Sequence, residues 1–229
     1  MEKKFDDYPH PAVTVDVVIF TVKDKELKVL LVKRKNEPFK NKWAIPGGFV
    51  RMNESLEEAT KRELFEETGV KDVYLEQLYS FGEVDRDPRG RVITIAYFAL
   101  ISLEKAAQKL RATTDVSEVA WFPISKLPEL AFDHAKILEY AKKRLRWKFE
   151  YTTVAFSLLD KKFTLSEVQK IYEIIFQKKF DKRNFRKKLL SLNILESAGK
   201  EKEVSHRPPQ LFSLKKKIGE IVEILKVQD

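Results

Sequence analysis

Cysteine is absent from the 229 residues of the chain. This absence excludes a disulfide scaffold, a thiol nucleophile and any zinc site with thiolate ligands. Long apolar runs are also missing, because the most sustained one, at 93–101, is well short of the roughly 20 residues that a membrane helix needs. No apolar core of signal-peptide type follows the charged N-terminal residues 1–7. We therefore expect a cytoplasmic globular protein with no membrane span, and the hydrophobic content of 43% agrees with that class.

The excess of basic side chains lies mostly in the last third of the chain. The full sequence has 44 Lys and Arg against 35 Asp and Glu, a formal net charge of +9. Residues 151–229 hold 17 basic and 10 acidic side chains, a net charge of +7, which leaves +2 for residues 1–150. Such asymmetry indicates a module that binds nucleic acid or a membrane surface, although basic surfaces also occur for solubility alone.

Hydrophobic periodicity predicts a mixed α and β unit in residues 1–150. Alternating segments rich in Val, Ile and Leu at 12–20 and 27–32, with a polar break between them, predict a hairpin. The other elements expected in this unit are a helix at 55–68, strands at 73–81, 92–101 and 119–123, and a closing helix at 132–147. Asn53 or Ser55 is expected near the cap of the first helix, and Gly69 is expected as its C-terminal stop.

Residues 151–229 show a different order of elements, and we place the boundary between two domains in the aperiodic segment 148–162. The order is that of a winged helix-turn-helix: a helix with a cap-like start, a turn, a basic helix and two strands around a charged loop. The predicted elements are a helix that begins near Thr164, a second helix at 182–192, strands at 194–198 and 210–214, and a last helix at 216–225.

The first predicted helix brings three carboxylates together. Glu63, Glu66 and Glu67 are spaced at i, i+3 and i+4 and so share one helix face. Like charges at this spacing repel, and each acidic group near the helix C-terminus opposes the dipole by roughly 0.3–1 kcal/mol. A divalent cation such as Mg²⁺ or Mn²⁺ would reverse both effects, because it prefers oxygen ligands and can bridge to substrate phosphates. The alternative is a solvated acidic helix face.

The spacing of the residues around this helix favours the metal site. Gly48 is followed after five residues by Glu54 and, after seven more, by Arg-Glu-Leu-Phe-Glu-Glu-Thr-Gly-Val at residues 62–70. This segment resembles the Nudix box at every fixed position. The resemblance implies an α/β/α sandwich with a mixed sheet, in which a loop-helix-loop binds divalent metal and hydrolyses a nucleoside diphosphate linked to another group.

The resemblance also implies roles for single residues. By match of position, the expected metal ligands are Glu63, Glu66, Glu67 and, nearby, the carbonyl of Gly48. Arg62 and Glu54 are expected to support them. The general base stays open: Glu67 is one candidate, and Glu118 is another, since related enzymes often take a carboxylate from the loop before Trp121. The alternative for Glu118 is an ordinary surface residue.

Several further residues are candidates for binding the substrate. Arg86 and Arg89, on the charged turn between two predicted strands, are suited to pair with phosphates, and Tyr97 or Phe81 to stack on a base. The alternative for the turn is a solvated hairpin tip.

The adjacent glycines Gly47 and Gly48 imply a backbone conformation or a close approach that side chains would forbid. Asp16 and the pair Lys33-Arg34 are candidates to line the pocket, although ordinary strand residues explain them equally well. The remaining candidates to consider are the histidines, which are too scattered for a metal cluster or a triad and receive no catalytic role: His10, His134 and His206.

A basic helix is the main candidate for a nucleic-acid contact. Residues 178–188 hold seven basic side chains and one acidic one. Such a helix can enter a major groove while its cations neutralise phosphates. The residues expected to contact DNA are Lys182, Arg183, Arg186 and Lys187 on the helix and Arg207 in the loop between the two strands. The alternative is a solvated basic helix face.

The likeness to a known family extends over nearly the whole chain. The segment 181–188, the pairs Arg207-Pro208 and Leu211-Phe212, the turn 81–91 and the run 132–134 resemble the Nudix-related transcriptional regulators. The resemblance implies a homodimer on double-stranded palindromic DNA, released when ADP-ribose or a pentose sugar occupies the Nudix domain.

Several of these regulators have a degraded Nudix box, whereas every catalytic position is filled here. Two functions stay open: a working hydrolase of ADP-ribose or a related nucleotide sugar that also binds DNA, and a repressor that only senses such a ligand.

Overall fold

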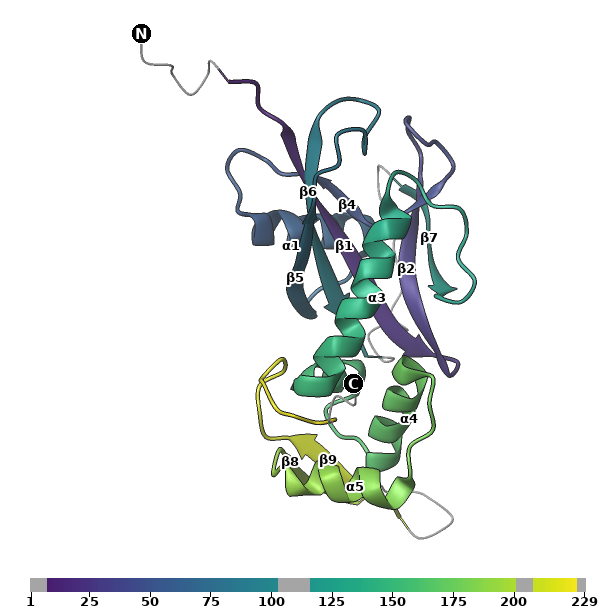
Figure 1. The fold of residues 1–229 in the computed structure, drawn as a ribbon, viewed down its shortest axis with the longest axis vertical. Coiled ribbons are helices and arrows are strands. Elements are labelled where there is room, and N and C mark those ends of the chain that lie inside the picture. The colour runs from purple at the N-terminus through teal and green to yellow at the C-terminus, as the bar shows by residue number, and fades with distance from the viewer. Residues whose placement is uncertain (1–7, 103–115, 201–207, 226–229) are drawn as a thin grey trace.

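The computed structural model describes residues 8–102, 116–200 and 208–225. Its first unit contains a seven-stranded mixed sheet (Figure 1). The strand order is β3-β2-β1-β6-β5, with β4 also paired to β1 and β7 to β2. Strands β1 and β6 are parallel, and the other pairs are antiparallel. The strands are β1 (Ala12–Lys23), β2 (Glu26–Arg34), β3 (Trp43–Ala44), β4 (Gly47–Phe49), β5 (Tyr74–Phe81), β6 (Val92–Leu100) and β7 (Val116–Pro123).

Helices α1 (Leu56–Thr68) and α3 (His134–Tyr151) pack on opposite faces of this sheet. The central strand β1 is buried on both sides, and successive side chains of a strand point to opposite faces. Val17 accordingly joins the buried cluster that contains Leu64 of α1, and Val18 joins the cluster that contains Leu138 of α3. The predicted α/β/α arrangement with a mixed sheet is confirmed, and none of the described helices is both long and apolar enough to span a bilayer.

The ends of α1 follow from local chemistry. The Ser55 hydroxyl accepts a hydrogen bond from the Glu58 N–H (3.2 Å), and the Glu58 carboxylate accepts one from the Ser55 N–H (2.8 Å). This capping box satisfies donors that the first turn leaves without partners. Gly69 ends the helix with a φ of 77°, which glycine adopts at little cost. The predicted helix and its stop are confirmed.

The second unit has the predicted order of helix, turn, helix and hairpin. Its elements are α4 (Leu165–Phe176), α5 (Lys182–Ser191), β8 (Leu195–Lys200) and β9 (Gln210–Leu214). Phe163 and Phe212 exchange backbone hydrogen bonds of 3.0 and 2.8 Å, which fastens the segment before α4 to the hairpin. Thr164 and Glu167 form a second capping box at the start of α4.

One expectation for this region is wrong. The predicted helix at 216–225 is absent, because Gly219 has a φ of 83° and the segment pairs its backbone with the end of α3. The Val222 N–H donates to the carbonyl of Tyr151 (2.8 Å), and Ile224 is buried. The segment 148–162, in which we place the boundary, contains the end of α3, which runs through Tyr151, and a 3₁₀ helix η2 (Thr153–Leu158).

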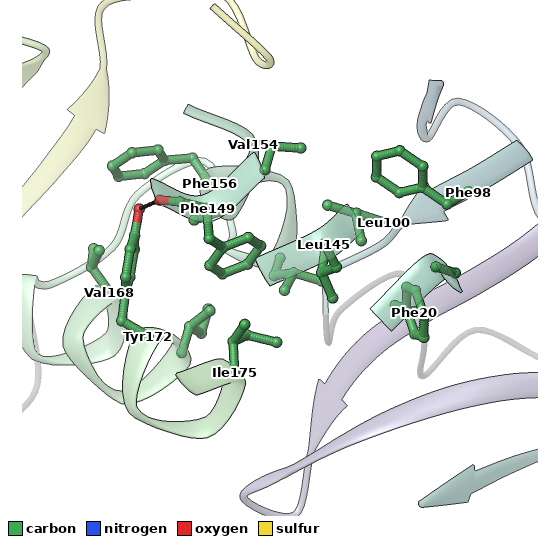
Figure 2. Close-up of a cluster of buried hydrophobic side chains, with 14 of the residues drawn as sticks. Phe20, Phe98, Leu100, Leu145, Phe149, Val154, Phe156, Val168, Tyr172 and Ile175 are labelled. Atoms are coloured by element: carbon green, nitrogen blue, oxygen red, sulfur yellow. Dashed lines mark hydrogen bonds between the residues drawn. The ribbon is translucent and has the colours of Figure 1, made fainter. Parts of the chain in front are cut away.

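One hydrophobic core joins the two units (Figure 2). Phe20 of the sheet and Leu145 and Phe149 of α3 belong to one buried cluster. Tyr172 and Ile175 of α4, in the second unit, belong to the same cluster. Tyr172 is fully buried, and its hydroxyl donates to the carbonyl of Phe149 (3.1 Å). Because a shared core couples the packing of both parts, we expect them to unfold together.

Replacing Phe149 by Ala tests this coupling. The ring is fully buried between the units, so its loss should lower the free energy of unfolding by about 3–5 kcal/mol. Scanning calorimetry should show one transition that moves to lower temperature. The control is Trp147→Ala on the same helix, where half of the side chain is exposed and the effect should be smaller. Two separate transitions in the parent protein would contradict the shared core.

Candidate functional site

A polar cavity of about 510 Å³ lies where the sheet, α1, the turn before β6 and the start of α3 meet. Its size is in the range of small-molecule sites. Ten residues that the sequence nominated line it, and they come from widely separated parts of the chain: Asp16, Arg34, Gly47, Gly48, Arg62, Glu63, Glu66, Glu67, Arg86 and Arg89. Glu54 and Glu118 are not among the lining residues.

Arg62 links the acidic side chains of the Nudix-like segment. Its Nε and Nη2 donate to the two carboxylate oxygens of Glu54 (2.9 and 2.6 Å), and its Nη1 donates to Glu63 (2.6 Å) and Glu66 (3.0 Å). The hydrogen bond from Arg62 lowers the pKa of Glu54 to about 2. Arg62, itself held by Glu54, is therefore in a position to orient Glu63 and Glu66.

Glu67 is the most deeply buried of the three glutamates. Burial raises its pKa to about 8, and the charges of Glu63 and Asp16 act in the same direction. The Gly47 N–H donates to the Glu67 carboxylate (2.9 Å). A Cβ on Gly48 would lie 2.3 Å from Oε1 of Glu63, so the expected close approach at the glycines is confirmed.

These oxygens fit a hard divalent cation by their chemistry. Within the described residues, no three His, Asp or Glu side chains are arranged as a metal site, and Arg62 donates to two of the glutamates, Glu63 and Glu66. The available donors are carboxylates beside the backbone of Gly48. Burial also raises the pKa of Glu63, and a cation would favour the ionised form of both buried glutamates.

The arginine turn differs from a solvated hairpin tip. Arg86 is buried, and its guanidinium donates to both carboxylate oxygens of Asp133 (2.7 and 3.1 Å) and lies 3.5 Å from Asp16. Arg89 donates to both oxygens of the buried Asp87 (3.0 and 2.7 Å). The ion pairs with Asp133 and Asp87 thus fix the turn, and both guanidiniums belong to residues that line the cavity.

Neither of the two rings expected to stack on a base, Tyr97 and Phe81, lines the cavity. Tyr97 is buried in the cluster under α1, where strand alternation points it away from the cavity, and Phe81 packs against Tyr79 and Tyr140. The phenyl rings that line the cavity are those of Phe49 and Phe132. Neither lies in a periodic pattern that would single it out.

Glu118 also lies elsewhere than expected. It is inside strand β7 rather than in a loop, directly opposite Lys33 in the ladder with β2. The Lys33 Nζ donates to its carboxylate (3.4 Å). Both side chains lie outside the cavity lining, whereas Asp16 and Arg34 are part of it.

His134 is a cavity residue that the sequence did not suggest. Its Nδ1 accepts a hydrogen bond from the Ile45 N–H (2.9 Å), and its Nε2 lies 3.7 Å from Oδ1 of Asp16. The ring is buried and lines the cavity at the first residue of α3. Burial lowers the pKa of His134, so the neutral ring is the form that the fold accommodates.

This burial predicts a pH dependence of stability. The unfolded chain has a His134 pKa near 6.5, and the folded value is lower, so only the unfolded state gains a proton just below pH ~6.5. The contribution is fully present above pH ~6.5 and should decline by roughly 1.4 kcal/mol per pH unit below it. Urea titrations with EDTA should show that the free energy of unfolding declines less below pH ~6.5 in His134→Asn than in the parent protein. An equal decline in both proteins would contradict this account.

The basic helix α5 presents three of its four nominated cations to solvent. Lys182, Arg183 and Lys187 are exposed, while Phe185 packs inward. Arg186 is partly buried, and its guanidinium donates to the Ser166 hydroxyl on α4 (2.8 Å), so it ties the two helices together. Arg207 lies outside the described residues.

Comparison with known proteins agrees with both parts of the structure. The family model of the NUDIX domain matches residues 10–141. The family model of the NrtR DNA-binding winged helix domain matches residues 155–214. The ADPR responsive transcriptional repressor NtrR of Acinetobacter baylyi is 40% identical over 208 residues, which are 90% of this chain and 83% of that protein.

Two further relatives each resemble a different share of the chain. The ADP-ribose pyrophosphatase of Methanocaldococcus jannaschii is 45% identical over 146 residues, 64% of this chain and 80% of that enzyme. The crystal structure of Shewanella oneidensis NrtR complexed with a 27mer DNA has a TM-score of 0.77 and 38% identity, covering 89% of this chain and 93% of its own. The chain therefore belongs to the Nudix family and, within it, to the regulators that join a Nudix domain to an NrtR-type winged helix domain.

Proposed function

We propose that this chain is a DNA-binding regulator that responds to ADP-ribose, and that its Nudix unit hydrolyses ADP-ribose or a related nucleoside diphosphate derivative. The observation that carries the proposal is one cavity in which the glutamates of an intact Nudix box face the guanidiniums of Arg34, Arg86 and Arg89. Carboxylates suit a cation and guanidiniums suit phosphate oxygens, so a metal-bound pyrophosphate matches both sets. An exposed basic helix lies on the same chain.

Hydrolases of the Nudix family generally use divalent metal ions. We assign the cation, Mg²⁺ or Mn²⁺, to Glu63, Glu66, Glu67 and the carbonyl of Gly48; when bound it would polarise the pyrophosphate and activate water. Glu67 is a better candidate for the base than Glu118, because it lines the cavity. Arg62 and Glu54 keep the glutamates oriented.

The winged helix unit supplies the output in this proposal. Exposed Lys182, Arg183 and Lys187 would neutralise DNA phosphates, and Arg207 is proposed to add a contact from the loop. We divide the chain at residues 150 and 151 and propose a homodimer, since a two-fold protein matches palindromic DNA. Light scattering of the purified protein tests the dimer directly.

A second candidate function is a sensor that does not hydrolyse its ligand, which is ADP-ribose or a pentose sugar. The repressor from A. baylyi, similar over 90% of this chain, is named for its response to ADPR.

Two measurements on the intact chain separate the candidates. The first is turnover of ADP-ribose with Mg²⁺, followed by release of phosphate in the presence of a phosphatase. The second is the affinity for a duplex selected from a random pool, with and without ADP-ribose. We expect turnover, DNA binding and weaker DNA binding with the ligand. Absent turnover with ligand-dependent DNA release establishes the sensor, and absent DNA binding overturns the regulator.

A further inference from the structure

Four side chains from separate parts of the chain form an alternating series of rings and guanidiniums beside the cavity. The Arg89 guanidinium carbon lies 5.1 Å from the ring centre of Phe49 and 5.7 Å from that of Phe132, and the Arg34 guanidinium carbon lies 4.9 Å from the Phe132 ring centre. All four residues line the cavity. We call this series the stacking cluster.

The stacking cluster is positioned by its surroundings. Buried Asp87 fixes the Arg89 guanidinium with two side-chain hydrogen bonds and also accepts the Arg89 backbone N–H (3.0 Å). The Arg34 Nε donates to the carbonyl of Pro38 (2.8 Å). Each guanidinium is therefore held near a ring face before any ligand arrives, which reduces the entropy lost on binding.

The backbone of Phe132 is strained in a way that local sequence does not require. Phe132 has a φ of 52° and Phe39 has a φ of 63°, in the left-handed region that bulky residues avoid. Their rings meet edge to face with centres 4.8 Å apart. Such strain persists only where the surrounding structure enforces it, and here it brings the Phe132 ring to the cavity.

The rings of the stacking cluster are not core residues. Phe49 is 46% exposed, and neither it nor Phe132 has the full burial that would explain a large aromatic residue by stability alone. A partly exposed ring with a planar guanidinium over it forms a stacked surface to which a flat, electron-rich group can add. A sugar or a phosphate has no such face.

We propose that the stacking cluster binds the nucleobase of the ligand, with Phe132 and Phe49 as the rings on which the base stacks. The inference rests on the proposed function and narrows it, because it requires a nucleoside diphosphate ligand rather than a pentose sugar. It also assigns the ring contact to residues other than Tyr97 and Phe81.

Ligands with and without a base test the proposal. Isothermal titration with EDTA present would compare ADP-ribose, AMP and ribose 5-phosphate, which lacks the base, on the intact chain and on Phe132→Leu and Phe49→Leu. Since a base loses its stacking partner when the ring is removed, each substitution should weaken the binding of ADP-ribose and of AMP by about tenfold. Binding of ribose 5-phosphate should stay within about twofold.

The matched control is Phe65→Leu, which removes an exposed ring with a cation over it, Lys71 at 4.4 Å, outside the cavity. It should leave all three affinities unchanged. Equal losses for ligands with and without a base, or unchanged AMP binding in both cavity variants, would overturn the inference alone. Failure of the parent protein both to bind ADP-ribose in EDTA and to hydrolyse it with Mg²⁺ would overturn the proposed function, and with it the inference.

Discussion

The Glu67→Gln variant should lose ADP-ribose turnover by about 100-fold or more while it still folds. The amide is nearly the same size, and its carbonyl oxygen can still accept the hydrogen bond from the Gly47 N–H. What it loses is the negative charge that a cation requires and the capacity to take a proton. Turnover with Mg²⁺, measured by phosphate release at several metal concentrations, gives the size of the loss.

The matched control for this variant is Glu57→Gln on the same helix. Glu57 is exposed, pairs with Lys61 and lies outside the cavity lining, so the same chemical change there should leave turnover unaltered. Retained turnover in Glu67→Gln would show that this carboxylate neither binds the cation nor acts as the base. A shift of the melting temperature by ADP-ribose in the variant would show that the ligand still binds.

Local sequence was sufficient for the acidic part of the site. The Ser55 cap, the glutamate spacing and the Gly69 stop act within a few residues of one another, so they define α1 and its carboxylate face without tertiary information. The approach of Gly48 to Glu63 also follows from a residue type that only a tight contact explains.

The other side of the cavity depends on contacts between distant segments. His134 meets Ile45 across 89 positions of sequence, and Arg86 meets Asp133 across 47. Hydrophobic periodicity describes single segments and does not indicate which distant residues form pairs. For this reason the sequence predicts a solvated turn or a ligand loop at Arg86, and not a buried ion pair. Phe132 reaches the cavity through a strained backbone that its own sequence does not favour.

The failed helix at 216–225 shows how apolar spacing misleads. Ile224 is buried, as a helical pattern would suggest, but the burial comes from an extended segment that pairs with the end of α3. Tertiary pairing overrides helix propensity here, and Gly219 supplies the turn that makes it possible.

Charge reversal on α5 of the winged helix unit should have the second large effect, a loss of DNA affinity. Reversing Lys182 and Arg183 to Glu should reduce the affinity for the selected duplex by about tenfold or more and lower the salt slope by about 2, since each phosphate contact contributes roughly 0.9. Both side chains are exposed on α5, so the fold should persist. Fluorescence anisotropy at several salt concentrations measures both quantities.

The control reverses Lys142 and Lys143 on α3, which are also exposed, and changes the net charge by the same amount. If the whole-molecule charge governed binding, the two double variants would behave alike; if α5 lies on DNA, only the α5 variant loses the salt slope. Arg186 is unsuitable for this test because its bond to Ser166 makes it part of the helix packing, so its loss would perturb the fold and the interface together. Equal slopes in both double variants would remove α5 from the DNA interface.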